Sequence, residues 1–293
     1  MHFLAYIIVY PILWLISILP FRLLYLISDG VYILLYHIIG YRKKVVTENL
    51  KLVFPDKPED EILAIRKKFY KHLCDMFLEM AKTMSISKAS LEKRFVLKNP
   101  EAINRFEEVN KSVLLMYGHY ASWEWSSQLQ NLTDFPGFAV YKKLANKYFD
   151  KMVRDIRSKF NTSLISTRET VGAITQSERN GVKSVIAFLS DQSPRLSKEV
   201  YWNEFMGIEV PCFTGAERLA KKLDLAIAYL KITKVKRGHY EAEIMMLSEN
   251  PKESPDYELT DMFLREVEKQ IYEAPEFYFW THKRWKHRNK KAE

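Results

Sequence analysis

Apolar and polar positions divide the chain into three unlike parts. Residues 3–19 carry no charge, and a second apolar stretch follows at 23–40 with one acidic residue, Asp29. Across residues 41–274, short apolar runs alternate with segments whose apolar positions recur at helical spacing. The last part, residues 275–293, mixes aromatic and basic side chains. The pattern predicts an N-terminal anchor followed by a domain of mixed helices and strands.

The middle part predicts strands and helices in alternation. Apolar runs bounded by polar residues predict strands at 113–117, 138–141, 164–166, 182–189, 225–232 and 240–247. Helical patterns predict helices at 41–57, 58–80, 147–160, 169–179, 211–222 and 260–274. Strands that alternate with helices are typical of an α/β fold built on one sheet.

The first 40 residues are predicted to anchor the chain in a membrane. The first apolar run has 17 residues, whereas a spanning helix typically needs roughly 20. A secretory signal would need a charged start and a small-residue cleavage site, and neither is present. We expect either one span or a helix pair lying partly in the bilayer; a buried core helix is the alternative.

Basic residues follow the apolar part and set the expected orientation. Arg22 and Arg42-Lys43-Lys44 come directly after apolar stretches. By the positive-inside rule, the bulk of the chain then lies on the cytoplasmic side. We therefore divide the chain into an anchor at residues 1–40 and a cytoplasmic-face domain at 41–293.

Composition and missing motifs limit the classes of partner and enzyme that this chain can represent. The chain has 293 residues and a formal net charge of +9, which suits nucleic acid, an anionic membrane surface or an acidic protein. The aromatic and basic tail at 275–293 also suits a membrane interface or an anionic partner. The two cysteines, Cys74 and Cys212, form no CxxC motif, so neither a disulfide scaffold nor a zinc site is expected. The motifs GxGxxG, GxxxxGK and GxSxG do not occur.

The strongest candidate chemistry lies directly after the strand at 113–117. Gly118 ends that strand, His119 follows at once, and Glu124 comes five residues later at the start of a predicted helix. Neutral imidazole can take a proton from a hydroxyl near neutral pH. A carboxylate on the other ring nitrogen can orient the ring and stabilise the cation. A purely structural histidine is the alternative.

Further polar residues follow other predicted strands. Asp191 comes after the strand at 182–189, so we expect it on the same sheet edge as His119. Arg157, Arg168 and Lys142 lie between the two along the chain, and such cations can hold a phosphate. Each of them taken alone also fits an ordinary surface charge.

At this point the chain resembles a known family, the late acyltransferases of lipid A biosynthesis, or lauroyl/myristoyl transferases. The matching segments span almost the whole chain. They are the N-terminal anchor, RKKVVTENLKLVFPDK, GHYASWEW, YKKLANKYFDKMVRDIR, the strand ending in Asp-Gln, FMGIEVPCFTGAERLAKKLD and PEFYFWTHKRWKHR.

The resemblance implies a fold, a reaction and partners. The fold would be glycerolipid-acyltransferase-like, with a single mixed sheet flanked by helices. The acyl donor would be an acyl carrier protein thioester, and the acceptor a hydroxyl of an underacylated lipid A precursor. The enzyme would work at the bacterial inner membrane, on its cytoplasmic face among membrane lipids. It would use no metal or organic cofactor and bind no nucleic acid.

The resemblance also implies roles for single residues. His119 matches the family's general base, and Glu124 matches the acid that would orient it. Arg157 would contact a donor or acceptor phosphate, and Arg168 is a looser match. Asp191 matches the family's Asp-Gln pair.

Two segments near the expected acceptor site depart from the family pattern. Tyr141-Lys142-Lys143 stands where the family commonly has Tyr-Arg-Pro. Residues 191–195 read DQSPR, where the family often has Asp-Gln-Asp-Tyr-Gly. We include Lys142 among the substrate-binding candidates.

Three other functions fit parts of the pattern. The same chemistry can act on another glycolipid, a phospholipid or an aminolipid. A metal-dependent membrane hydrolase would use His119, Glu124, Asp191 and His239, whose side chains suit a transition metal. A membrane-binding scaffold protein would need none of them.

Overall fold

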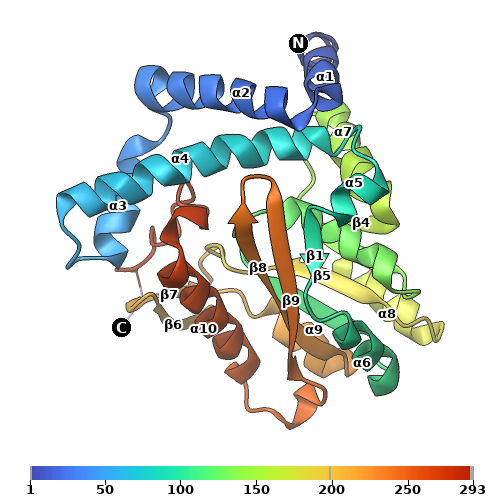
Figure 1. Cartoon of the computed structure of the whole chain (residues 1–293). Coiled ribbons are helices and arrows are strands. Elements are labelled where there is room, and N and C mark those ends of the chain that lie inside the picture. The colour runs from blue at the N-terminus through green and yellow to red at the C-terminus, as the bar shows by residue number, and fades with distance from the viewer. Residues whose placement is uncertain (1, 198, 291–293) are drawn as a thin grey trace.

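The computed structural model describes residues 2–197 and 199–290. A twisted sheet lies at the centre with helices packed around it, and helix α4 runs across its upper end in Figure 1. Helices α1 and α2 lie on the outer side of α4. The predicted α/β architecture, with one large sheet flanked by helices, is confirmed.

The N-terminal third is helical. Its elements are α1 (His2–Ile18), α2 (Phe21–Tyr32), a π-helix (Ile33–Ile39), α3 (Lys43–Val53) and α4 (Glu59–Lys82). The π-helix ends at Gly40, whose φ of 66° lies in the left-handed region that favours glycine. Helix α4 begins with three acidic residues, which the positive end of the helix dipole favours.

The large sheet has seven strands in the order β1-β9-β8-β2-β5-β3-β4. Their bounds are β1 (Phe95–Leu97), β2 (Val113–Tyr117), β3 (Gly137–Tyr141), β4 (Thr162–Ser166), β5 (Val185–Leu189), β8 (Ala226–Lys236) and β9 (His239–Ser248). Strands β8, β2, β5, β3 and β4 are parallel, and β9 is antiparallel to β8. The sheet is therefore mixed, and its parallel part carries the carboxyl ends of five strands to one edge.

The strand β2 lies at the centre of the core. All five of its residues are buried, as expected for a parallel strand covered on both faces. The remaining helices are α5 (Lys88–Glu92), α6 (Glu101–Val109), α7 (Lys147–Arg157), α8 (Thr170–Arg179), α9 (Gly215–Leu223) and α10 (Glu258–Glu273). Short 3₁₀ helices occupy Trp123–Leu132, Ser158–Phe160, Pro251–Glu253 and Pro275–Phe277.

The six predicted strands are present, but three others were not predicted. Strand β1 is only three residues long, too short to show a period. Strands β6 (Tyr201–Phe205) and β7 (Ile208–Cys212) form a separate antiparallel hairpin. Residues 211 and 212 belong to β7, so the helix predicted at 211–222 begins later, at Gly215.

The C-terminal tail packs into the protein, which corrects the prediction that its tryptophans suit a membrane interface. Trp280, Arg284 and Trp285 are fully buried. The Trp285 indole N–H donates to the Phe205 carbonyl at 3.2 Å, and Arg284 Nη1 donates to the Pro211 carbonyl at 2.9 Å. The Trp285 indole and one side of the Arg284 guanidinium thus find hydrogen-bond partners in the β6–β7 hairpin, away from any membrane interface.

We expect Trp285→Ala to lower the free energy of unfolding by about 3–5 kcal/mol, because it removes a large buried side chain and leaves a cavity. Urea denaturation in detergent measures this. Lys286→Ala is the matched control, since Lys286 is the exposed neighbour, and it should change stability by less than about 0.5 kcal/mol. Equal stability of the two variants would contradict a structural role for the tail.

Candidate active site

Four of the predicted site residues lie along one edge of the sheet. His119 follows β2, Asp191 follows β5, Lys142 follows β3 and Arg168 follows β4. These strands are parallel neighbours in the order β2-β5-β3-β4. Because side chains beyond the carboxyl ends of parallel strands share one edge, the residues form a row.

His119 and Asp191 are in direct contact. The His119 Nδ1 lies 2.6 Å from Asp191 Oδ1, and the His119 backbone N–H donates to Asp191 Oδ2 at 3.1 Å. Gly118 packs closely here, because a Cβ at that position would lie 3.3 Å from Val267 Cγ1, tighter than most real contacts. The Asp191 carboxylate therefore accepts two hydrogen bonds from His119, one from its ring and one from its backbone, and these fix the ring.

Asp191 is almost fully buried, yet it stays ionised. Burial by itself raises the pKa of a carboxyl group. The hydrogen bonds and charge of His119 overcome this, so the pKa of Asp191 is lowered from its usual value. Burial together with the nearby Asp191 carboxylate raises the pKa of Tyr278. Asp191 can therefore stabilise an imidazolium beside it.

The His119 ring is held between aromatic side chains. Its centroid lies 5.3 Å from the Trp123 ring and 6.1 Å from the Phe279 ring, and 19% of its side chain is exposed. Because Nδ1 donates to a carboxylate, we assign the neutral ring a free lone pair on Nε2. That nitrogen is available to accept a proton.

Glu124 binds Arg157 rather than the His119 ring. Arg157 Nε donates to Glu124 Oε2 at 2.8 Å and Nη2 donates to Oε1 at 2.5 Å, a bidentate pair. Burial acts to lower the pKa of Arg157, but the Glu124 carboxylate more than compensates and raises it. We expected Glu124 to orient the His119 ring, and this is wrong. Asp191 accepts the orienting hydrogen bond, while Glu124 binds Arg157.

Lys142 and Arg168 are exposed, farther along the same edge. Neighbouring strands are about 4.8 Å apart, so β3 lies about 10 Å from β2 and β4 about 14 Å. The fold brought His119 and Asp191 into contact with each other and Glu124 into contact with Arg157. It left Lys142 and Arg168 as separate surface cations in the same row.

The tail supplies site residues that the sequence did not indicate. The Phe279 backbone N–H donates to the His119 carbonyl at 3.1 Å, and Ala121 N–H donates to the Phe277 carbonyl at 3.0 Å. Ala121 has a φ of 50°, an unusual conformation for alanine that this contact supports. His282 Nε2 accepts from the Ser193 backbone N–H at 3.2 Å, two residues beyond Asp191. The aromatic content of the tail pointed to a membrane interface or an anionic partner, and no sequence signal indicated that the tail would pack against His119.

The four residues of the metal-hydrolase alternative are not brought together. His239 lies at the turn between β8 and β9, where its Nε2 is 3.3 Å from Arg94 Nη1. Glu124 is engaged by Arg157. Within residues 2–197 and 199–290, no group of three His, Cys, Asp or Glu side chains is arranged to hold a metal ion.

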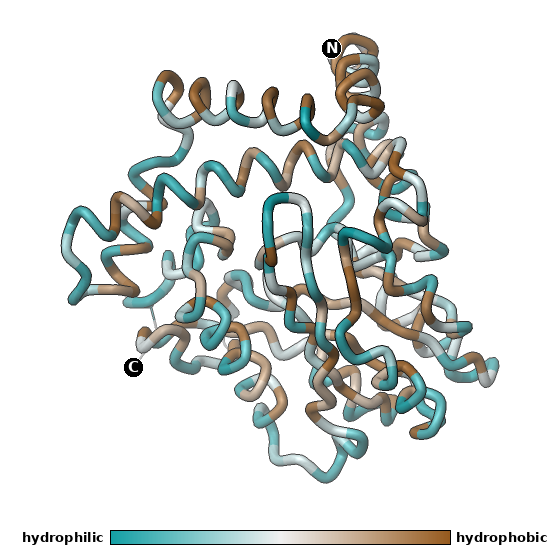
Figure 2. Tube along the Cα trace, in the orientation of Figure 1, coloured by the Kyte–Doolittle hydropathy of each residue, from teal (hydrophilic) through white to brown (hydrophobic). Residues whose placement is uncertain are grey.

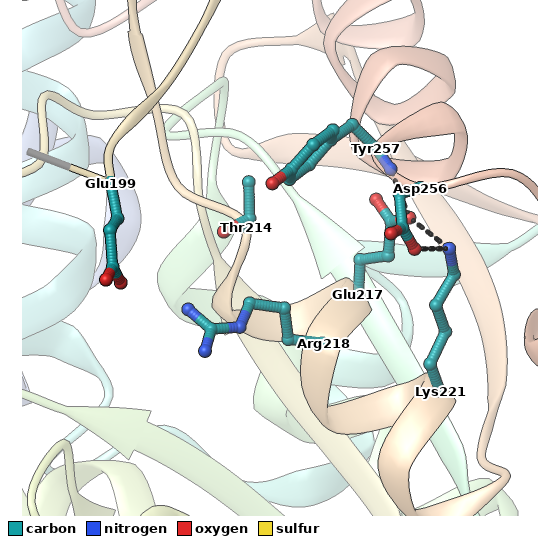
Figure 3. Close-up of a pocket in the computed structure, with 7 residues that line it drawn as sticks. All are labelled: Glu199, Thr214, Glu217, Arg218, Lys221, Asp256 and Tyr257. Atoms are coloured by element: carbon teal, nitrogen blue, oxygen red, sulfur yellow. Dashed lines mark hydrogen bonds and ion pairs between the residues drawn. The ribbon is translucent and has the colours of Figure 1, made fainter.

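A separate pocket of about 360 Å³ lies between α9 and the start of α10 (Figure 3). Glu217 is buried there and accepts from the backbone N–H groups of Tyr257 at 2.7 Å and Thr260 at 2.9 Å. These bonds satisfy the otherwise unpartnered donors at the start of α10. None of the predicted site residues lines this pocket. Its buried carboxylate, Glu217, caps the start of α10.

The α/β fold presents a His–Asp pair at the carboxyl edge of its parallel strands, an arrangement suited to general-base chemistry. The chain belongs to the bacterial lipid A biosynthesis acyltransferase family, which matches residues 2–287. This confirms the family that the sequence motifs indicated.

Individual relatives are distant but similar along their length. The chain is 23% identical to the lipid A biosynthesis lauroyltransferase of Escherichia coli (strain K12) over 278 residues, which are 94% of this chain and 90% of that protein. It is also 23% identical over 282 residues to the lipid A biosynthesis palmitoleoyltransferase of the same strain, with 94% and 89% covered. A lipid A biosynthesis acyltransferase of Shigella flexneri shows the same identity and coverage.

We expect stability to fall as the pH is lowered from 6.5 to 4, partly because of His282. Burial lowers the pKa of His282 to about 4, although Asp191 opposes the shift. Between pH 6.5 and 4 the unfolded chain then binds a proton that the folded chain does not, so folding is progressively disfavoured. Urea denaturation of wild type and His282→Gln across this range should show a shallower pH dependence in the variant.

His37→Gln is the control for that measurement, because the His37 ring is exposed. Burial also lowers the pKa of His72, so part of the pH dependence should persist in both variants. Identical slopes for wild type and His282→Gln would show that His282 does not need to stay neutral in the fold.

Proposed function

We propose that this protein is a membrane-bound O-acyltransferase that moves an acyl chain from an acyl carrier protein thioester to a hydroxyl of a lipid A precursor. It would act at the bacterial inner membrane, on the cytoplasmic side. The observation that carries the proposal is the 2.6 Å contact between His119 Nδ1 and Asp191, which leaves Nε2 able to accept a proton. The relatives named for lauroyl and palmitoleoyl transfer support the class of reaction.

The chemistry we propose is direct transfer. His119 Nε2 takes the proton of the acceptor hydroxyl as the oxygen attacks the thioester carbonyl. The tetrahedral intermediate collapses, the C–S bond breaks, and the imidazolium returns the proton to the thiolate. Asp191 stabilises the imidazolium throughout, since its carboxylate is buried beside the ring.

No acyl-enzyme is needed for this route. The obvious thiol nucleophiles, Cys74 and Cys212, are buried. Burial and nearby acidic residues raise the pKa of Cys74 to about 12, and burial raises that of Cys212 despite Arg284. Both thiols are therefore protonated near neutral pH, and a thiol is a poor nucleophile compared with a thiolate.

We propose that Glu124 acts on the site through Arg157. The bidentate pair fixes the guanidinium next to the loop that carries His119, while 31% of the Arg157 side chain remains exposed. An arginine held in this way has further N–H groups for a donor or acceptor phosphate. Lys142 and Arg168 extend the same positive edge, where a second phosphate of a diphosphorylated glycolipid can bind.

His119→Ala should lower kcat/KM by on the order of 10²–10⁴, because general-base catalysis contributes about that much. Purified protein in detergent, labelled acyl carrier protein and a tetra-acylated lipid A precursor give the measurement, with the product read by mass. Lys286→Ala, an exposed change outside the site, is the control. Full transfer by His119→Ala would exclude His119 as the base, and no transfer by wild type to this precursor would contradict the proposed acceptor.

Lys142→Gln combined with Arg168→Gln should raise the KM for the phosphorylated acceptor about fivefold per exposed contact and leave kcat nearly unchanged. The effect should shrink at high salt, because exposed charges are screened. Lys252→Gln is the matched control, since Lys252 is exposed after β9, near the opposite edge of the sheet. A similar KM for all three proteins would remove these cations from the acceptor site.

A further inference from the structure

The N-terminal helices expose an unusually long apolar surface. Ile8 in α1 is 64% exposed, Leu26 in α2 is 67% exposed and Ile38 in the π-helix is 73% exposed. Figure 2 shows apolar residues along α1 and on the outer turns of α2. Soluble monomers rarely show a contiguous apolar surface of this extent unless something covers it. We call the exposed apolar side chains of residues 3–39 the outer face.

The opposite side of α2 is fixed to the domain by polar contacts. The Ser28 hydroxyl donates to Asp75 Oδ1 at 2.7 Å, and the Tyr25 hydroxyl donates to Glu79 Oε1 at 2.8 Å. Asp29 forms an ion pair with Arg237 at 2.7 Å. The helix therefore lies along α4 through its whole length, as Figure 1 shows, and does not project away from it.

Helix α1 is fixed to the domain as well. Lys82 Nζ donates to the carbonyls of Ser17 at 2.6 Å and Leu19 at 2.7 Å, at the junction of α1 and α2. Nearer the start of α1, the Tyr6 ring stacks on the Tyr148 ring of α7 with centroids 5.6 Å apart. Both ends of α1 are thus tied to the body of the protein.

These contacts oppose a transmembrane arrangement. Residues 21–39 are long and apolar enough to cross a bilayer. To do so, however, α2 would have to leave Asp75 and Glu79, whose side chains are buried. Removing the partners of buried carboxylates is costly, and a spanning α2 would carry Asp29 into hydrocarbon. We propose that residues 3–39 lie in the plane of one leaflet, with the outer face among the acyl chains and no segment crossing the membrane.

The residues at the border of the outer face favour a leaflet with anionic headgroups. Lysine ammonium groups lie over tyrosine rings there: Lys43 Nζ is 4.1 Å from the Tyr36 centroid, Lys71 Nζ is 5.6 Å from Tyr32 and Lys147 Nζ is 5.2 Å from Tyr148. Tyrosine and lysine both favour the headgroup level, where the apolar part is buried and the polar end is wet. Rows of cations at that level are attracted to anionic phospholipid.

This arrangement brings the active site near the lipid. Helix α7 begins beside α1 and ends at Arg157, which is bound to Glu124. With 11 residues, it is about 16 Å long. A lipid acceptor whose chains stay in the leaflet can therefore present its headgroup to the sheet edge.

Depth measurements with spin labels test the proposal on the full chain. Both native cysteines are buried, so Leu26→Cys, Ile33→Cys and Ile38→Cys should label at the introduced thiol. On vesicles containing anionic phospholipid, the three labels should lie at similar depths, about 5–10 Å below the headgroups. A spanning helix would separate the first and last labels by about 18 Å along the bilayer normal.

Val182→Cys is the control, because this exposed side chain lies after α8, away from the outer face, and should stay in water. Label depths that differ by more than about 10 Å would overturn the in-plane arrangement. Labels shielded from both lipid and water, in a protein that dimerises, would assign the outer face to a second copy instead. The inference rests on the proposed membrane association but not on acyl transfer, so a protein that inserts as described yet transfers no acyl chain would contradict only the activity.

Discussion

The hydrogen bond between His119 and Asp191 is the interaction on which the arrangement of the site depends. It joins the carboxyl ends of two adjacent parallel strands, β2 and β5, whose register is fixed by a fully buried core. A buried carboxylate without a partner would be strongly destabilising. The Asp191 carboxylate therefore orients the His119 ring, and the ring in turn stabilises the buried carboxylate. Proton transfer at His119 Nε2 thus depends on the packing of β2 and β5 in the core of the sheet.

The tail completes this arrangement from the other side. Phe277 and Phe279 bond through their backbones to Ala121 and His119, and the Phe279 ring covers the imidazole. The loop after β2 would otherwise present unsatisfied backbone groups beside the reactive histidine. Aromatic and basic residues that suggest an exposed tail therefore serve as the wall of the site.

Charged networks connect the apolar N-terminal helices to the same body. Arg237, at the end of β8, binds both Asp29 of α2 and Asp75 of α4. Much of the polar side of α2 is engaged inside the protein, which leaves a mostly apolar surface to face outward. The ion pairs of Arg237 thus hold α2 against α4 and determine which side of α2 faces outward, toward a lipid surface.

Sequence periodicity alone determined the α/β class, six strands of the sheet and the shared edge of His119 and Asp191 after strand ends. These follow from local rules: buried parallel strands are short apolar runs, and their carboxyl ends gather at one edge. Only the tertiary structure decided that Asp191 holds His119 while Glu124 holds Arg157, because hydrogen-bond partners depend on distances between segments far apart in the chain. It also decided that the tail is buried, since the hairpin carbonyls that accept from Trp285 and Arg284 become available only when the chain folds. Sequence spacing fixes which face or edge a side chain occupies, and three-dimensional packing fixes what it touches.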